Sequence, residues 1–186
     1  MATRAKTATS SPGWELPSDQ KVLLLLRHAK SDWDTGLADH ERPLNLRGHR
    51  DAVGVGQRIA AARVEFDLVV SSTAIRTRQT WEQVVVGGAR SHEVRYLDQI
   101  YAAEVADLVA VVRALPEAAT SVLLIGHAPG VPDLVEILGS RTADPAWARL
   151  DSGYPTAGLT ALTLAGPWSS AHAGCAQLVA FEVPRG

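Results

Sequence analysis

The chain has 186 residues, a length that fits one domain or one domain with a tail. Hydrophobic residues make up 46% of the chain and charged residues 20%, so there is enough apolar material for a buried core. The formal net charge of −2 gives no global attraction to nucleic acid or to an anionic membrane, and we expect neither as a partner.

The first twenty residues are rich in Ala, Thr and Ser and lack the apolar stretch of a secretory signal. We expect residues 1–20 to form a flexible tail and residues 21–186 to form one domain. No apolar run approaches the roughly 20 residues that a membrane-spanning helix needs. Cys175 is the single cysteine, so no intrachain disulfide can form and a cytoplasmic location fits best. The oligomeric state stays unknown at this point.

Predicted strands and helices alternate from residue 21 onward. A run of Val and Leu without polar alternation predicts a strand buried on both faces over 21–26. A helix is expected after Asn45, which is a suitable N-cap. A second buried strand is expected over 66–70, followed by a helix over 74–86 that two glycines end.

The same alternation continues to residue 138. The predicted elements are a strand over 92–97, a helix over 103–115, a buried strand over 121–125 and a helix over 131–138. Beyond Gly139 the pattern changes, because 159–164 and 177–183 alternate in the manner of exposed edge strands suited to antiparallel pairing. Strands that alternate with helices predict an α/β sandwich with a largely parallel sheet.

Three of the predicted buried strands end in polar clusters. The clusters are Arg27-His28, the segment from Ser71 to Arg78, and Gly126-His127. Ligands of open α/β sheets bind beyond the carboxyl ends of the strands, and parallel strands bring those ends to one edge. We therefore expect the three clusters to meet in one site, although they lie far apart in the sequence.

The expected site is cationic and contains two imidazoles. Arg27 and Arg76 would supply planar donor forks suited to phosphate oxygens, and the helix that begins beside Arg76 favours anions at its N-terminus. No carboxylate cluster accompanies His28 and His127, which argues against a metal site of mixed ligands. A neutral imidazole is a competent nucleophile near pH 7, and nearby arginines disfavour the imidazolium of His28. The pattern suits in-line phosphoryl transfer.

These three blocks resemble the signature blocks of the histidine phosphatase superfamily and occur in the family's order. The stretch from Leu25 to Asp51, with Arg42-Pro43-Leu44 and Arg47-Gly48, is similar to the small phosphohistidine phosphatase branch, the SixA type. The resemblance covers residues 21–138 clearly and the rest more loosely. It implies a phosphoglycerate mutase-like fold, a three-layer sandwich whose mostly parallel central sheet is flanked by helices.

The resemblance also implies roles for particular residues. It implies that His28 becomes transiently phosphorylated and that Arg27, Arg76 and His127 hold the phosphoryl oxygens. Ser31 matches a loop position that often lines the phosphate pocket, so it is a further candidate for substrate binding.

Two positions depart from the family pattern, and the general acid is open. Ala29 stands where many members have Gly, and Thr73 where Pro is frequent.

Members that cleave phosphate monoesters carry an acid that protonates the leaving oxygen, and Asp98 and Glu104 are the candidates here. Neither sits in a strong motif. Cleavage of a P–N bond depends less on a general acid, since imidazole is a far less basic leaving group than an alkoxide.

We predict a metal-independent phosphatase without organic cofactor that forms a covalent phosphohistidine on His28 and acts on phosphohistidine in proteins. Two alternatives stay open: a phosphatase of a small phosphorylated metabolite, a phosphomonoester, and a non-catalytic phosphate-binding regulatory module. Trp33 and Tyr101 are candidates for the mouth of the pocket or for packing. No role is assigned to the other histidines, which are His40, His49, His92 and His172.

Overall fold

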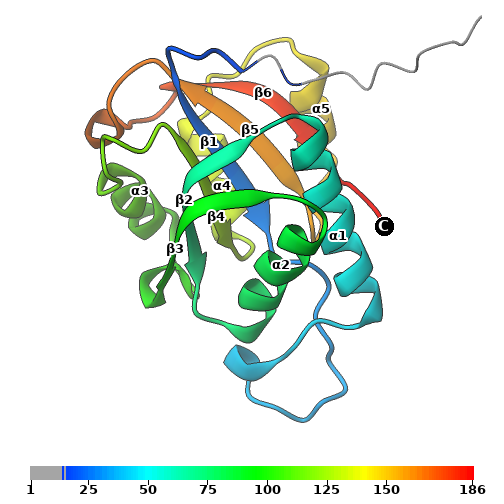
Figure 1. The fold of residues 1–186 in the computed structure, drawn as a ribbon. Helices are drawn as coiled ribbons and strands as arrows, with labels where there is room; N and C mark the ends of the chain where they lie inside the picture. Colours follow the sequence, from blue (N-terminus) through cyan, green and yellow to red (C-terminus); the bar gives the residue numbers. More distant parts are fainter. Residues whose placement is uncertain (1–13, 15) are drawn as a thin grey trace, which may run out of the picture.

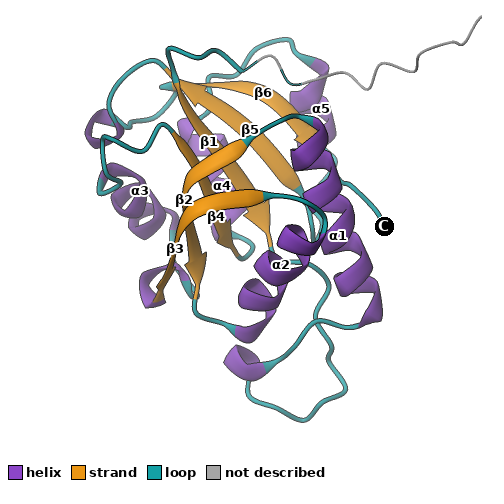
Figure 2. Cartoon of the chain, viewed as in Figure 1, coloured by secondary structure: helices purple, strands orange, loops and turns teal. Residues whose placement is uncertain are grey.

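The computed structural model describes residue 14 and residues 16–186, and shows a sheet with helices on both faces (Figure 1, Figure 2). The strands are β1 Lys21–Arg27, β2 Glu65–Ser72, β3 Arg90–Leu97, β4 Ser121–Gly126, β5 Leu159–Leu164 and β6 Ala176–Glu182. Their order in the sheet is β3-β2-β4-β1-β5-β6. The first four strands run parallel, and β5 runs antiparallel to both of its neighbours. The predicted α/β sandwich with a mostly parallel sheet is confirmed.

In the described part of the chain, five α-helices flank the sheet. They are α1 Leu46–Ala61, α2 Ile75–Val86, α3 Val105–Arg113, α4 Gly130–Leu138 and α5 Pro145–Asp151, joined by short 3-10 helices η1 Asp39–Glu41, η2 Asp98–Ile100 and η3 Trp168–Ser170. Helices α1 and α2 cover one face of the sheet, and α3, α4 and α5 cover the other (Figure 2). These are the three layers of the predicted sandwich.

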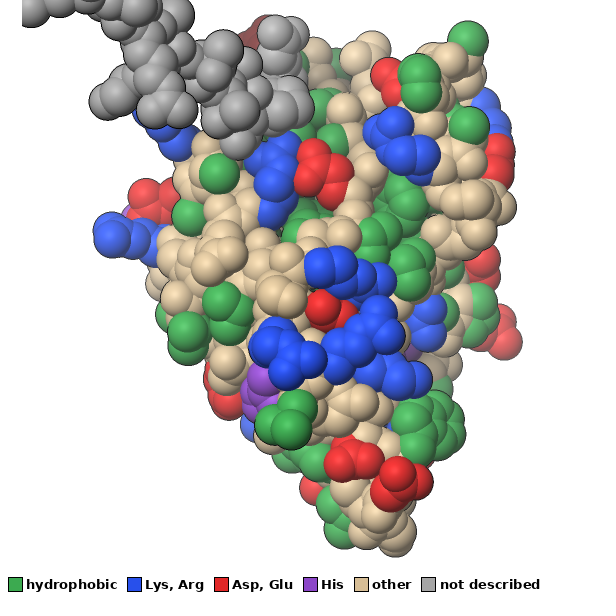
Figure 3. All heavy atoms as spheres, turned by 90° about the vertical axis from the view of Figure 1, so that its right-hand side faces the viewer, with side chains coloured by type: hydrophobic (Ala, Val, Ile, Leu, Met, Phe, Trp, Pro, Cys, Tyr) green, Lys and Arg blue, Asp and Glu red, His purple; other side chains and the backbone are tan. Residues whose placement is uncertain are grey.

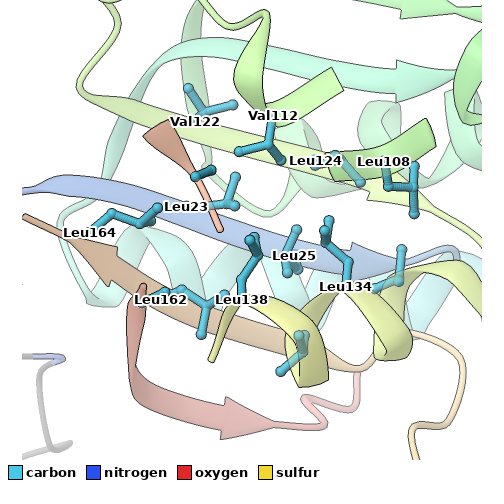
Figure 4. Packing of buried hydrophobic residues seen from close by; sticks show 14 of the residues in the cluster. Leu23, Leu25, Leu108, Val112, Val122, Leu124, Leu134, Leu138, Leu162 and Leu164 are labelled. Atoms are coloured by element: carbon cyan, nitrogen blue, oxygen red, sulfur yellow. The ribbon is translucent and has the colours of Figure 1, made fainter. Parts of the chain in front are cut away.

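The all-apolar sequence of β1 reflects its burial on both faces. Leu23 and Leu25 point into the core beneath α3 and α4, where Figure 4 shows Leu25 near Leu134 and Leu23 farther along β1. Leu24 and Leu26 point into the opposite core beneath α1 and α2. All four leucines are fully buried, and each contributes about 1.5–3 kcal/mol of hydrophobic stabilisation. This central position is the reason that the strand shows no polar alternation.

Helix α1 begins where the sequence indicates. The side chain of Asn45 accepts a hydrogen bond from the backbone N–H of Gly48 at 2.9 Å, which confirms Asn45 as the N-cap. Helices α1 and α2 then approach each other closely at two glycines. A Cβ atom on Gly56 would lie 2.0 Å from the carbonyl oxygen of Val84, and one on Gly87 would lie 2.3 Å from that of Val53.

The C-terminal part of the chain differs from the prediction in two ways. The prediction of β5 as an exposed edge strand is wrong, because β5 lies between β1 and β6 and all its residues are buried. Its apparent alternation comes from buried threonines, and the Thr160 hydroxyl finds a partner in the Tyr154 hydroxyl at 2.9 Å. Helix α5 was not predicted. It is a short helix with Asp144 as N-cap and Pro145 in its first turn.

Most of the expected tail, residues 1–13 and 15, lies outside the described residues. Within the range 1–20, the ring of Trp14 lies 4.4 Å from the Arg58 guanidinium, and its Nε1 donates to Glu182 at 2.9 Å. The division into tail and domain stays a prediction. No helix in the described part of the chain has the length and apolarity to cross a bilayer.

Candidate active site

Three neighbouring strand ends form one edge of the sheet. Strand β4 lies between β1 and β2, and Arg27 pairs with Gly126 in the parallel register. The backbone N–H of His28 donates to the carbonyl of Gly126 at 2.9 Å, so the chain after β1 is attached to the end of β4. The three polar clusters that follow these strands are thereby brought together, as the sequence predicts.

His28 lies in this cluster with a defined ring orientation. Its side chain is buried, and Nδ1 lies 2.7 Å from the carbonyl oxygen of Ala29. A carbonyl oxygen can only accept, so the neutral ring carries its proton on Nδ1 and its lone pair on Nε2. The His28 and His127 ring centroids are 5.1 Å apart. His28 thus presents an unprotonated nitrogen beside the second imidazole.

Both imidazoles are held neutral. Burial lowers the pKa of His28 to about 3, aided by the charges of Arg76 and Arg27 and opposed by the hydrogen bond to Ala29. Burial likewise lowers the pKa of His127 to about 4, with Arg76 as the next cause. Each value lies well below the ordinary 6.5. The lone pair of His28 is therefore available at neutral pH, as a nucleophile requires.

The histidines and arginines line one pocket of about 330 Å³. Its polar and aromatic lining consists of Arg27, His28, Lys30, Ser31, Trp33, Asp39, Arg42, Arg76, Tyr101, His127 and Thr156. The predicted residues Arg27, His28, Ser31, Arg76 and His127 are all present. A larger hollow of about 710 Å³ lies beside α5 and the end of β6, but its lining has one arginine and no histidine.

The two predicted phosphate-binding arginines are engaged differently. Nη1 of Arg27 donates to the carbonyl of Tyr154 at 2.6 Å. Arg76 is buried, and it donates from Nη1 to the carbonyl of Asp39 at 2.5 Å and from Nη2 to the Asp39 carboxylate at 2.9 Å. The Nε atoms of both arginines are buried without a partner among the described residues. The guanidinium of Arg76 is thus occupied by an anion from its own chain.

That anion belongs to a part of the site that sequence reasoning missed. One Asp39 oxygen accepts from Nε and Nη2 of Arg42, at 3.1 and 2.5 Å, and the other accepts from Arg76 and from the Tyr101 hydroxyl at 2.9 Å. Burial raises the pKa of Asp39, but these hydrogen bonds and the Arg76 charge outweigh it and bring the pKa to about 2. Asp39 is an ionised carboxylate at neutral pH. In the sequence, Arg42 stands out only because Arg42-Pro43-Leu44 resembles the SixA branch of the family. Asp39 lies in a segment that contains no motif.

Asp98 and Glu104, the predicted candidates for a general acid, do not line the pocket that holds His28. Asp98 is exposed and accepts a hydrogen bond from the Thr73 hydroxyl at 2.6 Å. Glu104 is exposed at the start of α3 and lines a neighbouring hollow that also touches His127. His40, which had no predicted role, lies beside the site, with Nε2 3.0 Å from the Thr73 hydroxyl.

Buried hydroxyl groups form hydrogen bonds around His28, Arg76 and His127. The Ser72 hydroxyl lies 2.9 Å from Nε2 of His127. The Thr80 hydroxyl accepts from the backbone N–H of Ala29 at 3.0 Å and donates to the carbonyl of Arg76 at 2.6 Å. Helix α2 is thereby tied to the loop that carries His28. Both hydroxyl groups lie within the predicted cluster or just beyond it, yet nothing in the sequence distinguishes them from core residues.

A strained residue supports the backbone of Arg27 and His28. Ala157 has a φ of 61°, a left-handed conformation that residues with a Cβ atom rarely adopt. Its backbone N–H donates to the carbonyls of Arg27 and His28, at 3.1 and 3.2 Å. The loop before β5 thus holds the chain on which Arg27 and His28 lie.

Comparisons with known proteins agree with this geometry. The pattern of the histidine phosphatase superfamily (branch 1) matches residues 23–104. An uncharacterised protein of Mycobacterium tuberculosis is 36% identical over 162 residues, which are 86% of this chain and all of that protein. A Nakamurella multipartitia structure, assigned as the phosphohistidine phosphatase SixA, is 33% identical with a TM-score of 0.79, over 90% of this chain and 98% of that one. A structure from Agrobacterium tumefaciens with the same assignment is 32% identical with a TM-score of 0.71, over 88% and 98% of the two chains.

Proposed function

The chain belongs to the histidine phosphatase superfamily, and from that premise we propose that it is a metal-independent phosphatase that forms a covalent phosphohistidine on His28 and hydrolyses phosphohistidine in proteins. One observation carries the proposal: the buried ring of His28 holds its proton on Nδ1 against the Ala29 carbonyl, beside His127 and Arg76. This arrangement leaves a nucleophilic nitrogen in a cationic pocket.

The reaction has two displacements at phosphorus. In the first, the Nε2 lone pair of His28 forms a bond to phosphorus while the bond to the leaving group breaks and its electron pair departs with that group. The Ala29 carbonyl accepts from Nδ1–H and stabilises the positive charge that develops on the ring. Arg27, Arg76 and His127 donate to the phosphoryl oxygens. In the second, water attacks phosphorus, the electron pair of the breaking P–N bond returns to Nε2 of His28, and phosphate leaves with the protons of the water.

The pocket's own carboxylate favours a P–N substrate over an alkyl phosphate. Among the described residues, Asp39 is the only carboxyl side chain that lines this pocket, and its pKa of about 2 keeps it from donating a proton at neutral pH. An alkoxide leaving group needs such a proton, whereas a phosphohistidine ring that already carries a proton on its second nitrogen departs as neutral imidazole, which is far less basic. The names of the similar structures point to the same substrate class.

Basic side chains also lie outside the pocket. Figure 3 shows Lys and Arg side chains gathered over the middle of the face on which α1 lies. The net charge of the whole chain is −2, so this gathering is local. A local positive potential attracts phosphorylated ligands without making the whole protein basic.

The test is to trap the intermediate. After rapid quenching with a phosphohistidine protein as donor, we expect an acid-labile, base-stable phosphoryl group that maps to His28. His28→Ala should remove it, and the matched variant His92→Ala, at an exposed position on β3, should retain it.

Substrate class is tested by parallel turnover of a phosphohistidine protein, an aryl phosphate and an alkyl phosphate. Preference for the alkyl phosphate would support a phosphatase of small phosphorylated metabolites instead. Binding of phosphate without turnover of any of the three would support a regulatory phosphate-binding module. Turnover that His28→Ala leaves unchanged would contradict the mechanism itself.

A further inference from the structure

We propose that Arg42 forms an outer anion subsite next to the phosphoryl site, which receives a carboxylate that the substrate carries close to its phosphoryl group. The proposal deepens the proposed function and rests on it for the position of the phosphoryl group. It assigns a role to the Arg42-Pro43-Leu44 segment, which the mechanism above does not use.

Arg42 is an arginine fixed in the wall of the pocket. Its side chain is only 9% exposed, and its guanidinium lies 3.6 Å from the ring centroid of Trp33, which is 68% exposed. Nη1 of Arg42 is buried without a partner among the described residues. Burying a guanidinium with unmet donors is costly unless an anion compensates. The Arg42 side chain is thus prepared to bind an anion in a defined position.

The anion now at Arg42 shows which chemistry fits there. One Asp39 oxygen accepts from both Nε and Nη2 of Arg42, and the other accepts from Nη2 of Arg76. A single carboxylate therefore spans from the outer arginine to an arginine of the phosphoryl site. The two guanidinium groups form one continuous cationic strip, and its outer end already binds a carboxylate.

Asp39 must leave this position when the substrate binds. A phosphoryl group on Arg76 would share the guanidinium with the ionised Asp39 carboxylate that Nη2 now binds, and the two negative charges repel each other. The Asp39 side chain is 53% exposed on the short helix η1, so it can turn toward solvent, whereas the side chain of Arg42 is held by burial and by Trp33. Departure of Asp39 leaves the Nε and Nη2 donors of Arg42 open to a second anion.

The size and charge of the pocket agree with a substrate that carries two anionic groups. Pockets of about 300 Å³ and more accommodate whole small molecules, so 330 Å³ exceeds what one phosphoryl group requires. Lys30 lines the same pocket and adds positive charge. In a phosphorylated protein, the second group would be an Asp or Glu side chain next to the phosphohistidine. In a metabolite, it would be a carboxylate on the phosphorylated molecule.

The first experiment measures binding, so it does not depend on turnover. Orthophosphate and pyrophosphate are titrated calorimetrically into His28→Ala protein with and without Arg42→Gln. We expect Arg42→Gln to weaken pyrophosphate binding roughly tenfold or more, since a hydrogen bond to a charged group is worth about 1.5–3 kcal/mol. Orthophosphate binding should change much less. Arg90→Gln, which removes the same charge at the opposite end of the sheet, is the matched control.

Equal weakening of both ligands by Arg42→Gln would overturn the subsite, because Arg42 would then act on the phosphoryl site or on the fold. Asp39→Asn gives an independent test that keeps Arg42. It should strengthen binding of both ligands, and pyrophosphate more, because it removes the competing charge. Weaker pyrophosphate binding in folded Asp39→Asn protein would show that Asp39 positions the arginines, and this too would overturn the proposal.

The second experiment distinguishes the two sources of the carboxylate. Phosphohistidine peptides with Glu or Gln beside the phosphohistidine form one pair, and phosphoglycolate and ethyl phosphate form the other. The wild-type protein should prefer the carboxylated member of at least one pair, and Arg42→Gln should remove that preference. If no peptide is turned over but the pyrophosphate difference persists, the proposed substrate fails and the subsite stands. Absence of preference in both pairs would contradict the carboxylate assignment.

Discussion

The chemistry of His28 depends on two local features, burial and one backbone carbonyl. Burial disfavours the imidazolium, and the Ala29 carbonyl selects the tautomer with its lone pair on Nε2. His127 is also held neutral, so its ring can donate one hydrogen bond while it accepts another. The nearby Ser72 hydroxyl is the group that orients it. Both histidines therefore act as neutral groups in an otherwise cationic pocket.

This assignment predicts the pH behaviour of two histidines. In an NMR titration, the ring signals of His28 and His127 should stay unchanged from pH 8 down to about pH 5 and move only near their pKa values, about 3 and 4. His28→Gln and His127→Gln identify the signals. A midpoint near 6.5 for either ring would contradict the assignment.

The same pKa values make stability depend on pH. In the unfolded chain each histidine binds a proton near pH 6.5, but in the folded protein only near pH 3 or 4. The unfolded state thus holds more protons between these values, so the stability contributed by the two neutral rings is present above pH 6.5. It is lost progressively as the pH falls from 6.5 through the folded pKa values of about 4 and 3.

Among the secondary-structure elements, α1 and α2 show how tightly the framework of the site is packed. The backbones meet at Gly56 and Gly87, where a Cβ atom would overlap a carbonyl oxygen. Helix α2 carries Arg76 and Thr80, and both contact the neighbourhood of the nucleophile. The spacing of the two helices therefore controls where the arginine lies.

We predict that Gly56→Ala destabilises the protein by about 1–3 kcal/mol, as overpacking of a filled interface does. Helix propensity acts in the opposite direction, since Ala is favoured over Gly by about 1 kcal/mol inside a helix. Urea denaturation measures the difference. Gln57→Ala, at the adjacent exposed position of α1, is the control and should change stability by less than about 0.5 kcal/mol. An unchanged or raised midpoint for Gly56→Ala would refute close helix contact.

The elements also show what the sequence can predict. Strands β1, β2 and β4 are apolar runs that end abruptly in polar residues, so their positions and their shared edge follow from the pattern. Strand β5 was misjudged because its threonines are polar in sequence, yet in the fold their hydroxyl groups are buried.

The loop between β1 and α1 has no periodicity. Nothing local could therefore indicate that Asp39 binds Arg76, 37 positions away, as well as its near neighbour Arg42. Contacts of this kind depend on the path of a loop in three dimensions. They are the part of the site that only the structure supplies.

For the molecule as a whole, the proposed reaction requires no metal ion. In the part of the chain that the structure describes, no three His, Cys, Asp or Glu side chains lie together as potential metal ligands. In the proposed reaction, the cationic side chains that line the pocket would provide the charge stabilisation that a metal ion supplies in other phosphatases. We expect EDTA to leave phosphatase activity unchanged. A large loss that added Mg²⁺ or Zn²⁺ restores would contradict the mechanism.

The order of the strands has a consequence for how the protein is made. Strand β1 comes before the other five in the chain, yet its neighbours are β4 and β5, so Leu24 pairs with Leu123 and Ala161. During synthesis, the leucine run of β1 stays without a strand partner until β4, residues 121–126, has left the ribosome, and it gains its second partner only with β5, residues 159–164. Pairing between strands that lie far apart in the sequence makes folding slow, and an apolar strand that stays unpaired and exposed is prone to aggregate. His28 is translated early, but its surroundings are completed only when β5 arrives.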